Sequence, residues 1–585
     1  MYALPRHAWQ RLGVAALTAL AFAAPATAAP ANTPAQEVDL RVLAANDFHG
    51  NLEPPTGSSG SLPDSQGIAT PVGGAAYLAT HLRQLRTGKK NTVAVHAGDA
   101  IGGTPLLSGL FRDEPAIDSL NAMGMNIAGV GNHEYDEGTK ELLRMDRGGC
   151  HPVDGCFDED GFSGAKFPFL AANVITRKSG LPMLPPVTVK LYNGVPVGFI
   201  GVTLEGTPEI VAAEGIKTVR FENEITSVNR WTKVLRLLGV KAIVVLIHQG
   251  GFSTGGPNEC GPGTRDGSNL TGEIVDLAKG FSSEVDVVVS GHTHWAYVCE
   301  IPDPAGNPRL VTSSSSFGRA ITVLDLKLNK KTGDVIRSKS TATNHLVTRN
   351  VEADPTQTAL IAKWQAKVGP IAGRVVGKIT ADITRAPGGA RDKESSLGNL
   401  IADAQWKQTE ASGSGGAQLA LMNPGGVRAD LTFAASPNGG ADGEVTYGEL
   451  YSVQPFGNNL VTMTLTGAQI ETALEQQWTQ TNPTTVRQLF LGISDSLRYT
   501  YSASGPVGNK IDPASITLGG APLNPTATYR VTVNSFLADG GDGFLVLKDG
   551  TDRVTGAIDV DAFEDYVTER SPVAPASANR VTVLP

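Results

Sequence analysis

Short apolar runs alternate with helical stretches through the first half of this chain of 585 residues. Several of the runs are continuously apolar over four to eight residues, which is typical of strands buried on both faces of a sheet. Gly124 and Gly239 directly follow two of the helical stretches, as glycine commonly does at the end of a helix. The alternation predicts a layered α/β fold. The predicted strands are Val38–Ala45, Thr92–Ala97, Ile127–Val130, Pro168–Val174, Pro196–Leu204, Ala242–Ile247 and Val285–Ser290, and the predicted helices include Ala75–Arg86, Pro115–Met123 and Glu222–Leu238.

The pattern changes near residue 351. Asp354-Pro355 opens a predicted helix, Thr356–Val368, which Gly369-Pro370 closes. We interpret this helix as a linker between two globular regions. In the second region we expect a strand over Arg374–Ile383, helices over Ser396–Thr409 and Thr466–Trp478, and mixed strands and turns through Ala527–Val533 and Phe544–Leu547.

The N-terminus has the layout of a secretory signal peptide. Basic residues are followed by a largely apolar run of thirteen residues, Leu12–Ala24, and then by the small residues Ala26-Thr27-Ala28. We predict a signal peptide over residues 1–28, cleaved near Ala28, and export to the periplasm or the medium. The apolar run is too short to span a bilayer comfortably, so no membrane anchor is expected.

Composition and cysteine content narrow the possible functions. The formal net charge is −9 and 41% of the residues are hydrophobic. This negative net charge excludes sequence-independent binding to nucleic acid or to an anionic membrane. The four cysteines, Cys150, Cys156, Cys260 and Cys299, form no CxxC pair. Export permits disulfides, with Cys150–Cys156 and Cys260–Cys299 as one of three pairings, and free thiols are the alternative.

Five of the predicted strands end in residues that can bind metal ions. Ends of strands converge on one rim of an α/β sheet, where ligands bind. Imidazole and carboxylate groups are ligands for zinc, manganese or iron, and a shared carboxylate can bridge two ions about 3.5–4 Å apart. The residue types therefore fit a dinuclear metal centre, and such a pair of ions can polarise a phosphoryl oxygen. The segments are Asn46-Asp47-Phe48-His49-Gly50, Gly98-Asp99, Gly131-Asn132-His133-Glu134-Tyr135-Asp136, His248-Gln249-Gly250 and Gly291-His292-Thr293-His294.

These segments resemble the motif series of the calcineurin-like metallophosphoesterases, and the second half resembles the C-terminal domain of the 5′-nucleotidase family. The motifs of the second half are Glu394–Leu400, Asn423–Arg428, Gln454–Asn458 and Gly540–Phe544. The resemblance implies a four-layer metallophosphoesterase α/β sandwich over residues 38–345. A linker helix or hinge would follow at 351–370, and an α/β nucleoside-binding domain at 371–585.

The same resemblance implies roles for single residues. One metal ion would bind Asp47, His49, Asp99 and His294, and the second would bind Asp99, Asn132, His248 and His292. His133 would be the catalytic histidine and Asp136 its orienting partner. Some members carry an amide at the position of His294, so histidine there could alter the metal preference.

The second half would hold the nucleoside. Phe456 and Phe536 occupy the positions of the two aromatic residues that sandwich the base, and Asp542 matches the residue that accepts from ribose hydroxyls. Pro387 stands where some members have a second arginine. The remaining polar contacts match Arg391, Asn423, Arg428 and Asn458.

The resemblance implies a secreted phosphohydrolase with two divalent metal ions that releases phosphate from nucleoside 5′-phosphates for salvage. UDP-sugars and other nucleoside diphosphate compounds are further candidate substrates. The alternatives are a 2′,3′-cyclic-nucleotide 2′-phosphodiesterase with 3′-nucleotidase activity, and a secreted nucleotide-binding protein or adhesin with an inactive site. The expected partner is a small nucleotide and no nucleic acid. We expect a monomer, with a dimer as the alternative.

Overall fold

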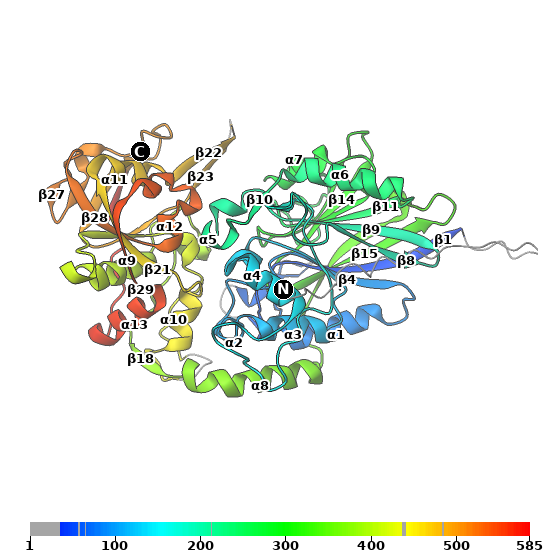
Figure 1. Ribbon diagram of the computed structural model, residues 1–585, viewed down its shortest axis with the longest axis horizontal. Helices are drawn as coiled ribbons and strands as arrows, with labels where there is room; N and C mark the ends of the chain where they lie inside the picture. Colours follow the sequence, from blue (N-terminus) through cyan, green and yellow to red (C-terminus); the bar gives the residue numbers. More distant parts are fainter. Residues whose placement is uncertain (1–35, 56–58, 65, 212, 436–439, 483–484) are drawn as a thin grey trace, which may run out of the picture. The chain divides into compact units, whose positions relative to one another are not determined.

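Two mixed sheets pack face to face in the first half of the chain in the computed structural model (Figure 1). Each has parallel strands at its centre and antiparallel strands at an edge. Side chains such as Val42 and Val244 fill the apolar layer between them. The first sheet contains β1 (Glu37–Ala45), β4 (Thr92–Ala97), β5 (Ile127–Gly129), β6 (Phe169–Leu170), β15 (Ala320–Asn329), β16 (Asp334–Val335) and β17 (Thr341–Leu346). The second contains β8 (Val187–Tyr192), β9 (Val195–Val202), β11 (Ala242–Ile247), β12 (Val287–Val289), β13 (Ala296–Pro302) and β14 (Pro308–Ser314).

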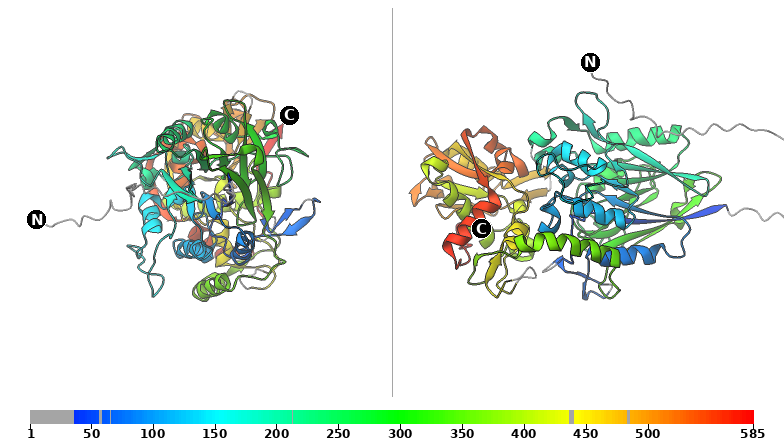
Figure 2. Two further views of the ribbon diagram at one scale, coloured as in Figure 1. Left: turned by 90° about the vertical axis from the view of Figure 1, so that its right-hand side faces the viewer. Right: turned by 60° about the horizontal axis from the view of Figure 1, so that its bottom comes forward.

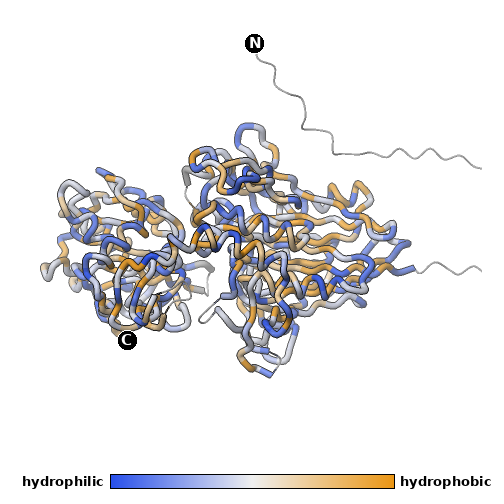
Figure 3. The backbone as a smooth tube through the Cα atoms, turned by 90° about the horizontal axis from the view of Figure 1, so that it is seen from below, coloured by the Kyte–Doolittle hydropathy of each residue, from blue (hydrophilic) through white to orange (hydrophobic). Residues whose placement is uncertain are grey.

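Helices cover the outer face of each sheet (Figures 1 and 2). Leu78 and Ile117 belong to the core on the outer side of the first sheet, and Val228 and Ala278 to the core outside the second. Figure 3 shows hydrophobic and hydrophilic segments alternating along the backbone. The predicted four-layer α/β sandwich is thus confirmed. The helices are α1 (Ala75–Arg86), α2 (Leu106–Gly109), α3 (Glu114–Ala122), α4 (Gly138–Arg147), α5 (Ala213–Ile216), α6 (Glu224–Leu237) and α7 (Ile274–Gly280).

The structure describes residues 36–55, 59–64, 66–211, 213–435, 440–482 and 485–585. The predicted signal peptide, residues 1–28, lies outside this part. Within it, no helix is both long and apolar enough to cross a membrane.

The linker helix is longer than the sequence predicted. Helix α8 spans Pro355–Ala372 and passes through Gly369-Pro370, where the prediction ended it. Its side chains Trp364, Val368 and Ala372 are buried at intervals of four residues. Residues four apart share one face of a helix, so packing of this face extends the helix by one turn. The free energy gained by this packing offsets the loss of one backbone hydrogen bond at Pro370, which has no N–H to donate.

The second half is built on a five-stranded sheet with helices on both faces. Helix α9 has the predicted bounds, and the Ser395 hydroxyl caps it by accepting from Gly398 N at 2.9 Å. The five strands of this sheet are β19 (Leu419–Met422), β21 (Asn459–Thr466), β24 (Gly492–Ile493), β28 (Thr528–Asn534) and β29 (Thr551–Ile558). A smaller sheet contains β25 (Leu497–Ser502), β26 (Thr517–Leu518), β27 (Ala521–Pro522) and β30 (Val581–Leu584). Strands β18 (Val375–Lys378) and β20 (Glu444–Thr446) form a separate pair. The helices are α9 (Ser396–Thr409), α10 (Tyr447–Val453), α11 (Gly467–Glu475), α12 (Ser535–Ala538) and α13 (Asp559–Arg570).

Several predicted strands are shorter in the structure. Pro168–Val174 divides into β6 and β7, because Asn173 leaves the ladder and its amide donates to Thr203 O at 2.7 Å. Arg374–Ile383 is reduced to β18, whose partner β20 has only three residues. The minor strands are β2 (Ser61–Pro63), β3 (Ala69–Pro71), β7 (Val174–Thr176), β10 (Val219–Phe221), β22 (Trp478–Asn482) and β23 (Thr485–Gln488).

Two predicted elements of the second half end differently. Thr466 caps α11 through a reciprocal hydrogen-bond pair with Gln469. The helix stops at Glu475, before the predicted end at Trp478, which begins β22. Leu545–Asp549 forms 3₁₀ turns, which follow the tight turn around Asp542.

Candidate active site

The candidate metal ligands of the first half meet at the carboxyl ends of β1, β4, β5, β11 and β12. Their ligand atoms form close groups within 4.8 Å of one another. Five of the residues are at most 2% exposed, namely Asp47, His49, Asp99, Asn132 and His248. The groups are Asp47–His49–His294, His49–Asp99–His133 and Asp99–His248–His292.

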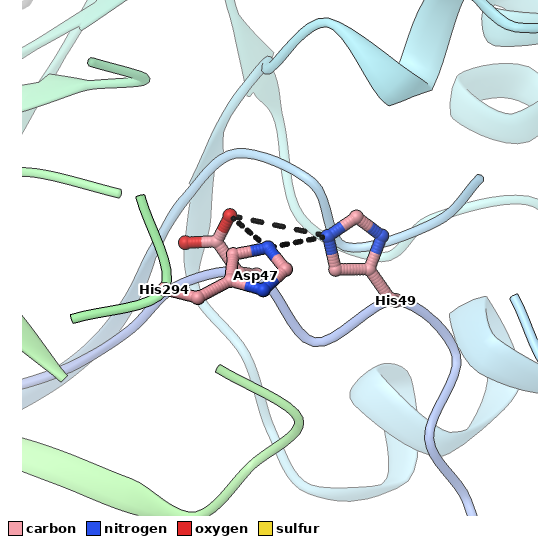
Figure 4. A group of neighbouring side chains, drawn as sticks. All are labelled: Asp47, His49 and His294. Atoms are coloured by element: carbon pink, nitrogen blue, oxygen red, sulfur yellow. Dashed lines mark hydrogen bonds and ion pairs between the residues drawn. The ribbon is translucent and has the colours of Figure 1, made fainter. Parts of the chain in front are cut away.

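Asp47, His49 and His294 face one another (Figure 4). His294 Nε2 lies 3.3 Å from Asp47 Oδ1 and 3.2 Å from His49 Nε2. Ligand atoms around a tetrahedral ion with bonds of about 2.1 Å lie about 3.4 Å apart. His49 Nδ1 donates to Gly102 O at 2.7 Å, which leaves the Nε2 lone pair directed at the group. These three side chains therefore fit a divalent metal ion.

A second group lies beside the first and is joined to it by Asp99. His248 Nδ1 donates to Ala97 O at 2.9 Å, so Nε2 is the ring nitrogen that can bind a metal ion once its proton is lost. That buried Nε2 lies 2.9 Å from Asp99 Oδ2 but makes no hydrogen bond of acceptable geometry. His292 Nδ1 lies 3.1 Å from Asn132 Oδ1. A buried, unpaired imidazole nitrogen beside a carboxylate fits a second metal ion.

The electrostatics of the two groups also favour cations. Burial opposes ionisation of Asp99, but the charge of His248 outweighs it and holds the pKa of Asp99 well below its usual value. Burial alone would lower the pKa of His248, yet Asp99 and Asp47 raise it to about 10. Burial lowers the pKa of His49 well below its usual value. A buried site with two ionised carboxylates is stabilised by positive charge.

The backbone is strained around these ligands. Asp47, His49, Asp99, His292 and His294, five of the seven candidate ligands, have positive φ between 46° and 71°. Residues other than glycine adopt this conformation only where the surrounding structure enforces it, and such residues cluster at functional sites. The strain is consistent with a preorganised ligand set.

His133 and Asp136 lie together on a 3₁₀ turn, His133–Tyr135, and its following residue. His133 Nδ1 is 2.9 Å from Asp136 Oδ2. Burial opposes a charged imidazole, but the charges of Asp136 and Asp99 raise the pKa of His133. The arrangement favours an imidazolium next to the metal groups. His133 also belongs to a close group with His49 and Asp99.

Glu134 holds the loops of the centre together, a role that the sequence analysis did not assign. Its carboxylate accepts from Gly131 N at 2.6 Å, Ala100 N at 2.7 Å and Asp99 N at 3.0 Å. Burial and the charge of Asp99 raise its pKa to about 7. An acidic residue directly after His133 in the motif was the available signal.

The candidate nucleoside contacts form a hydrogen-bonded chain in the second half. Asn423 Nδ2 donates to Asp542 Oδ2 at 2.9 Å, and Asn534 Nδ2 donates to Asn423 Oδ1 at 2.9 Å. Asn458 Nδ2 donates to Asp559 Oδ2 at 3.3 Å. Asn534 and Asp559 position these groups, and nothing in the sequence pattern singled them out.

Phe456 lies over His133, with the ring centroids 5.7 Å apart and the planes 14° from parallel. The Arg428 guanidinium lies 5.6 Å from the centroid of the same ring. Phe536 packs closely against Gly541, where an added Cβ would lie 2.5 Å from its ring. The structure thus brings Phe456 and Arg428 of the second half to His133 of the first.

Comparison with known proteins agrees with this arrangement. Residues 40–296 match the model for the calcineurin-like phosphoesterases, and residues 375–549 match the model for the 5′-nucleotidase C-terminal domain. The cell wall protein Lmo0130 of Listeria monocytogenes is 34% identical, with 95% of this chain and 70% of that protein covered. A 5′-nucleotidase precursor of Thermus thermophilus is similar in structure, with a TM-score of 0.74, 29% identity, and 94% of this chain and 99% of that chain covered.

The chain belongs to the 5′-nucleotidase family of metallophosphoesterases. Like other members of the 5′-nucleotidase family it is a metal-dependent hydrolase. Endonuclease YhcR of Bacillus subtilis is 32% identical over 94% of this chain, and the chain spans 41% of the length of that relative. The roles of the single residues stay predictions.

Proposed function

We propose that this chain hydrolyses nucleoside 5′-monophosphates to a nucleoside and inorganic phosphate. The observation that carries the proposal is the contact of Phe456 with His133. This contact sets a candidate base-stacking ring directly beside the groups suited to phosphoryl chemistry.

Two divalent ions, when bound, supply Lewis-acid polarisation of the phosphoryl group and lower the pKa of water. Asp47, His49, Asp99 and His294 would hold one ion, and Asp99, Asn132, His248 and His292 the other. Their buried, strained setting fixes the ligand atoms before substrate arrives.

His133 stabilises charge on the transferring phosphoryl group. Asp136 holds Nδ1, so Nε2–H of the imidazolium is free to donate to a phosphoryl oxygen. Water adds to phosphorus, the bond from phosphorus to the 5′-oxygen breaks, and the nucleoside leaves with a proton on that oxygen.

The second half binds the nucleoside. Phe456 and Phe536 stack on the base, which tolerates different bases because each base has a π face. Asp542 is held by Asn423 and accepts from ribose hydroxyls, and Arg391, Arg428 and Asn458 complete the polar contacts.

The predicted signal peptide supports an exported enzyme, and the similarity to a cell wall protein is consistent with it. Outside the cytoplasm the reaction would convert charged nucleotides into uncharged nucleosides. We infer a role in nucleotide salvage, with a monomeric chain as the working unit.

Two other activities compete with this proposal. A 2′,3′-cyclic-nucleotide 2′-phosphodiesterase with 3′-nucleotidase activity would use the same two halves. A secreted binding protein or adhesin would need no intact metal centre, and the close groups of ligand atoms speak against it.

A substrate panel distinguishes these functions. Phosphate release is measured from AMP, ATP, UDP-glucose, NAD and 2′,3′-cyclic AMP with zinc or manganese, beside the Asp99→Ala variant as a blank. We expect AMP to have the highest kcat/KM. A preference for the cyclic nucleotide would favour the phosphodiesterase, and release from none of them would favour the binding protein.

A further inference from the structure

The loop after β4 connects the candidate metal centre to a more distant turn of the chain. His49 Nδ1 donates to Gly102 O in this loop at 2.7 Å, which fixes the ring orientation of a candidate metal ligand. Glu134 holds the start of the loop, because its carboxylate accepts from Asp99 N and Ala100 N. Gly102 lies two residues further along, beyond these two contacts.

Gly102 fits closely against the candidate catalytic pair, His133 and Asp136. Its φ is 81°, and an added Cβ would overlap His133 O and lie 2.8 Å from Asp136 Oδ2. The backbone of Gly102 therefore passes through a narrow space between this pair and His49. A small shift of the peptide would move its carbonyl oxygen away from His49 Nδ1.

Asp113 anchors Gly102 from the other side. Its Oδ2 accepts from Gly102 N at 3.0 Å, and its Oδ1 accepts from Ser108 Oγ at 2.7 Å. Asp113 directly precedes α3, yet its carboxylate makes these two contacts instead of capping that helix. Asp113 N also donates to Ser108 O at 3.1 Å, so both the backbone and the side chain of Asp113 are tied to Ser108.

The turn that presents Asp113 is costly to form. Arg112 and Asp113 are consecutive residues with positive φ, 52° and 61°, which the surrounding structure has to enforce. Burial raises the pKa of Asp113, and the hydrogen bonds from Ser108 and Gly102 oppose that rise. Backbone strain of this kind clusters at functional sites, so the turn points to a role of Asp113 in the neighbouring centre.

We infer that Asp113 is a positioning residue of the candidate metal centre. Its carboxylate holds the Gly102 peptide, and Gly102 O in turn holds His49 with Nε2 directed at the metal ion. The inference rests on the proposed function in so far as His49 is a ligand of one of the two ions. Outer hydrogen-bond partners of metal ligands typically contribute about 10–100-fold to metal affinity or activity.

A metal titration tests this inference without a nucleotide. The stripped protein is titrated with zinc in competition with a chromophoric chelator, for the wild type, Asp113→Gly, Asp113→Asn and Asp552→Gly. Glycine adopts positive φ without strain, so Asp113→Gly removes the carboxylate and keeps the backbone of the turn. We expect one of the two ions to bind about 10–100-fold more weakly in Asp113→Gly, and the other ion to bind within about threefold of the wild type.

Two of these variants separate positioning from a general effect on structure. Asparagine keeps an oxygen that can accept from Gly102 N, so we expect both ions to bind Asp113→Asn within about threefold of the wild type. Asp552 is an exposed aspartate of the second half with a φ of 48°, and the matched control Asp552→Gly should bind both ions as the wild type does. If Asp113→Gly does not fold, Asp113→Ser replaces it with the same expected loss, because the shorter serine side chain does not reach Gly102 N.

Phosphate release gives a second readout. The zinc concentration for half-maximal release from AMP should rise about tenfold or more in Asp113→Gly, whereas KM for AMP at saturating zinc should stay within about twofold of the wild type. A rise in KM without a shift in the zinc dependence would overturn the inference. If the wild type binds two ions but does not hydrolyse AMP, the proposed function fails, while the metal titration still decides the role of Asp113.

The titration can contradict the inference in several ways. Unchanged affinity for both ions in Asp113→Gly would overturn it, and so would an equal loss of affinity for both ions, which a general loss of structure produces. An equal loss in Asp113→Asn or in Asp552→Gly would overturn it as well, because the hydrogen bond from Gly102 N would then not be the cause.

Discussion

Asp99 lies where the two candidate metal groups meet. Its Oδ2 is 2.9 Å from His248 Nε2 and 3.6 Å from His49 Nε2. A carboxylate in this position can bind both ions, so its loss affects the pair and not one ion alone.

We therefore expect the Asp99→Ala variant to lose most of its bound metal and its kcat to fall at least about a thousandfold, because the substitution removes both a metal ligand and its negative charge. Elemental analysis of the purified protein and phosphate release from AMP measure the two effects. Asp160→Ala, at an exposed loop residue, is the control. Two metals per chain in Asp99→Ala, with turnover near that of the wild type, would contradict the assignment.

His133→Ala should behave differently, because His133 is assigned to the phosphoryl group. We expect kcat to fall by about 10²–10³-fold while the metal content stays that of the wild type. Asp136→Asn, which weakens the hold on Nδ1, should give a smaller loss of kcat. Loss of metal in His133→Ala would instead place His133 among the ligands, as its contact with His49 and Asp99 allows.

At the residue scale, the convergence of the candidate ligands could be predicted, because each of them comes directly after an apolar strand and the ends of these strands meet at one edge of the sheets. The positive φ values of the ligands and the carbonyl groups that fix the tautomers of His49 and His248 could not. They depend on loops that are distant in sequence.

At the scale of elements, loops are anchored by two disulfides, Cys150–Cys156 and Cys260–Cys299. The second joins the long loop after β11 to β13, and both of its cysteines are buried. It closes a loop of 39 residues, whereas the first spans six.

Closing a longer loop removes more entropy from the unfolded chain. We expect Cys260→Ala with Cys299→Ala to cost about 4 kcal/mol of unfolding free energy, and Cys150→Ala with Cys156→Ala about 2 kcal/mol. Urea unfolding of the two double variants and the wild type measures the difference. A larger loss from the six-residue pair would show that packing in its loop, and not loop closure, dominates.

Most helices and central strands were predictable because local pattern and tertiary burial agree, as in α1, α9 and β11. The prediction failed at the end of α8, where Gly369-Pro370 signals a stop. Burial of Val368 and Ala372 overrides that local signal. The sequence pattern indicates only the local conformational preference of each segment, whereas the last turn of α8 forms because its side chains pack against other parts of the fold.

At the scale of the whole molecule, the candidate metal ligands and the candidate nucleoside contacts come from different halves. All candidate ligands precede residue 300, and all candidate nucleoside contacts follow residue 390. Phe456 of the second half stacks on His133 of the first half, and Arg428 lies against the same Phe456 ring. The hinge role of residues 351–370 stays a prediction.

Removing the aromatic pair should therefore separate nucleoside binding from phosphoryl chemistry. We expect Phe456→Ala with Phe536→Ala to lower kcat/KM for AMP by about 10²-fold or more, chiefly through KM, since base stacking is worth about 1–3 kcal/mol per base. Hydrolysis of p-nitrophenyl phosphate, which has no base, should fall far less. Phe433→Ala, at a partly exposed ring of the second half, is the control. Equal losses on both substrates would argue against a stacking role.

The most direct test of the account is phosphate release from 5′-AMP by the full chain, before and after its metal is removed. A chelator strips the protein, and zinc or manganese is then returned in steps. We predict no release from the stripped protein and full recovery at about two metal ions per chain. Undiminished release after stripping, or no release at any metal content, would contradict a dinuclear 5′-nucleotidase.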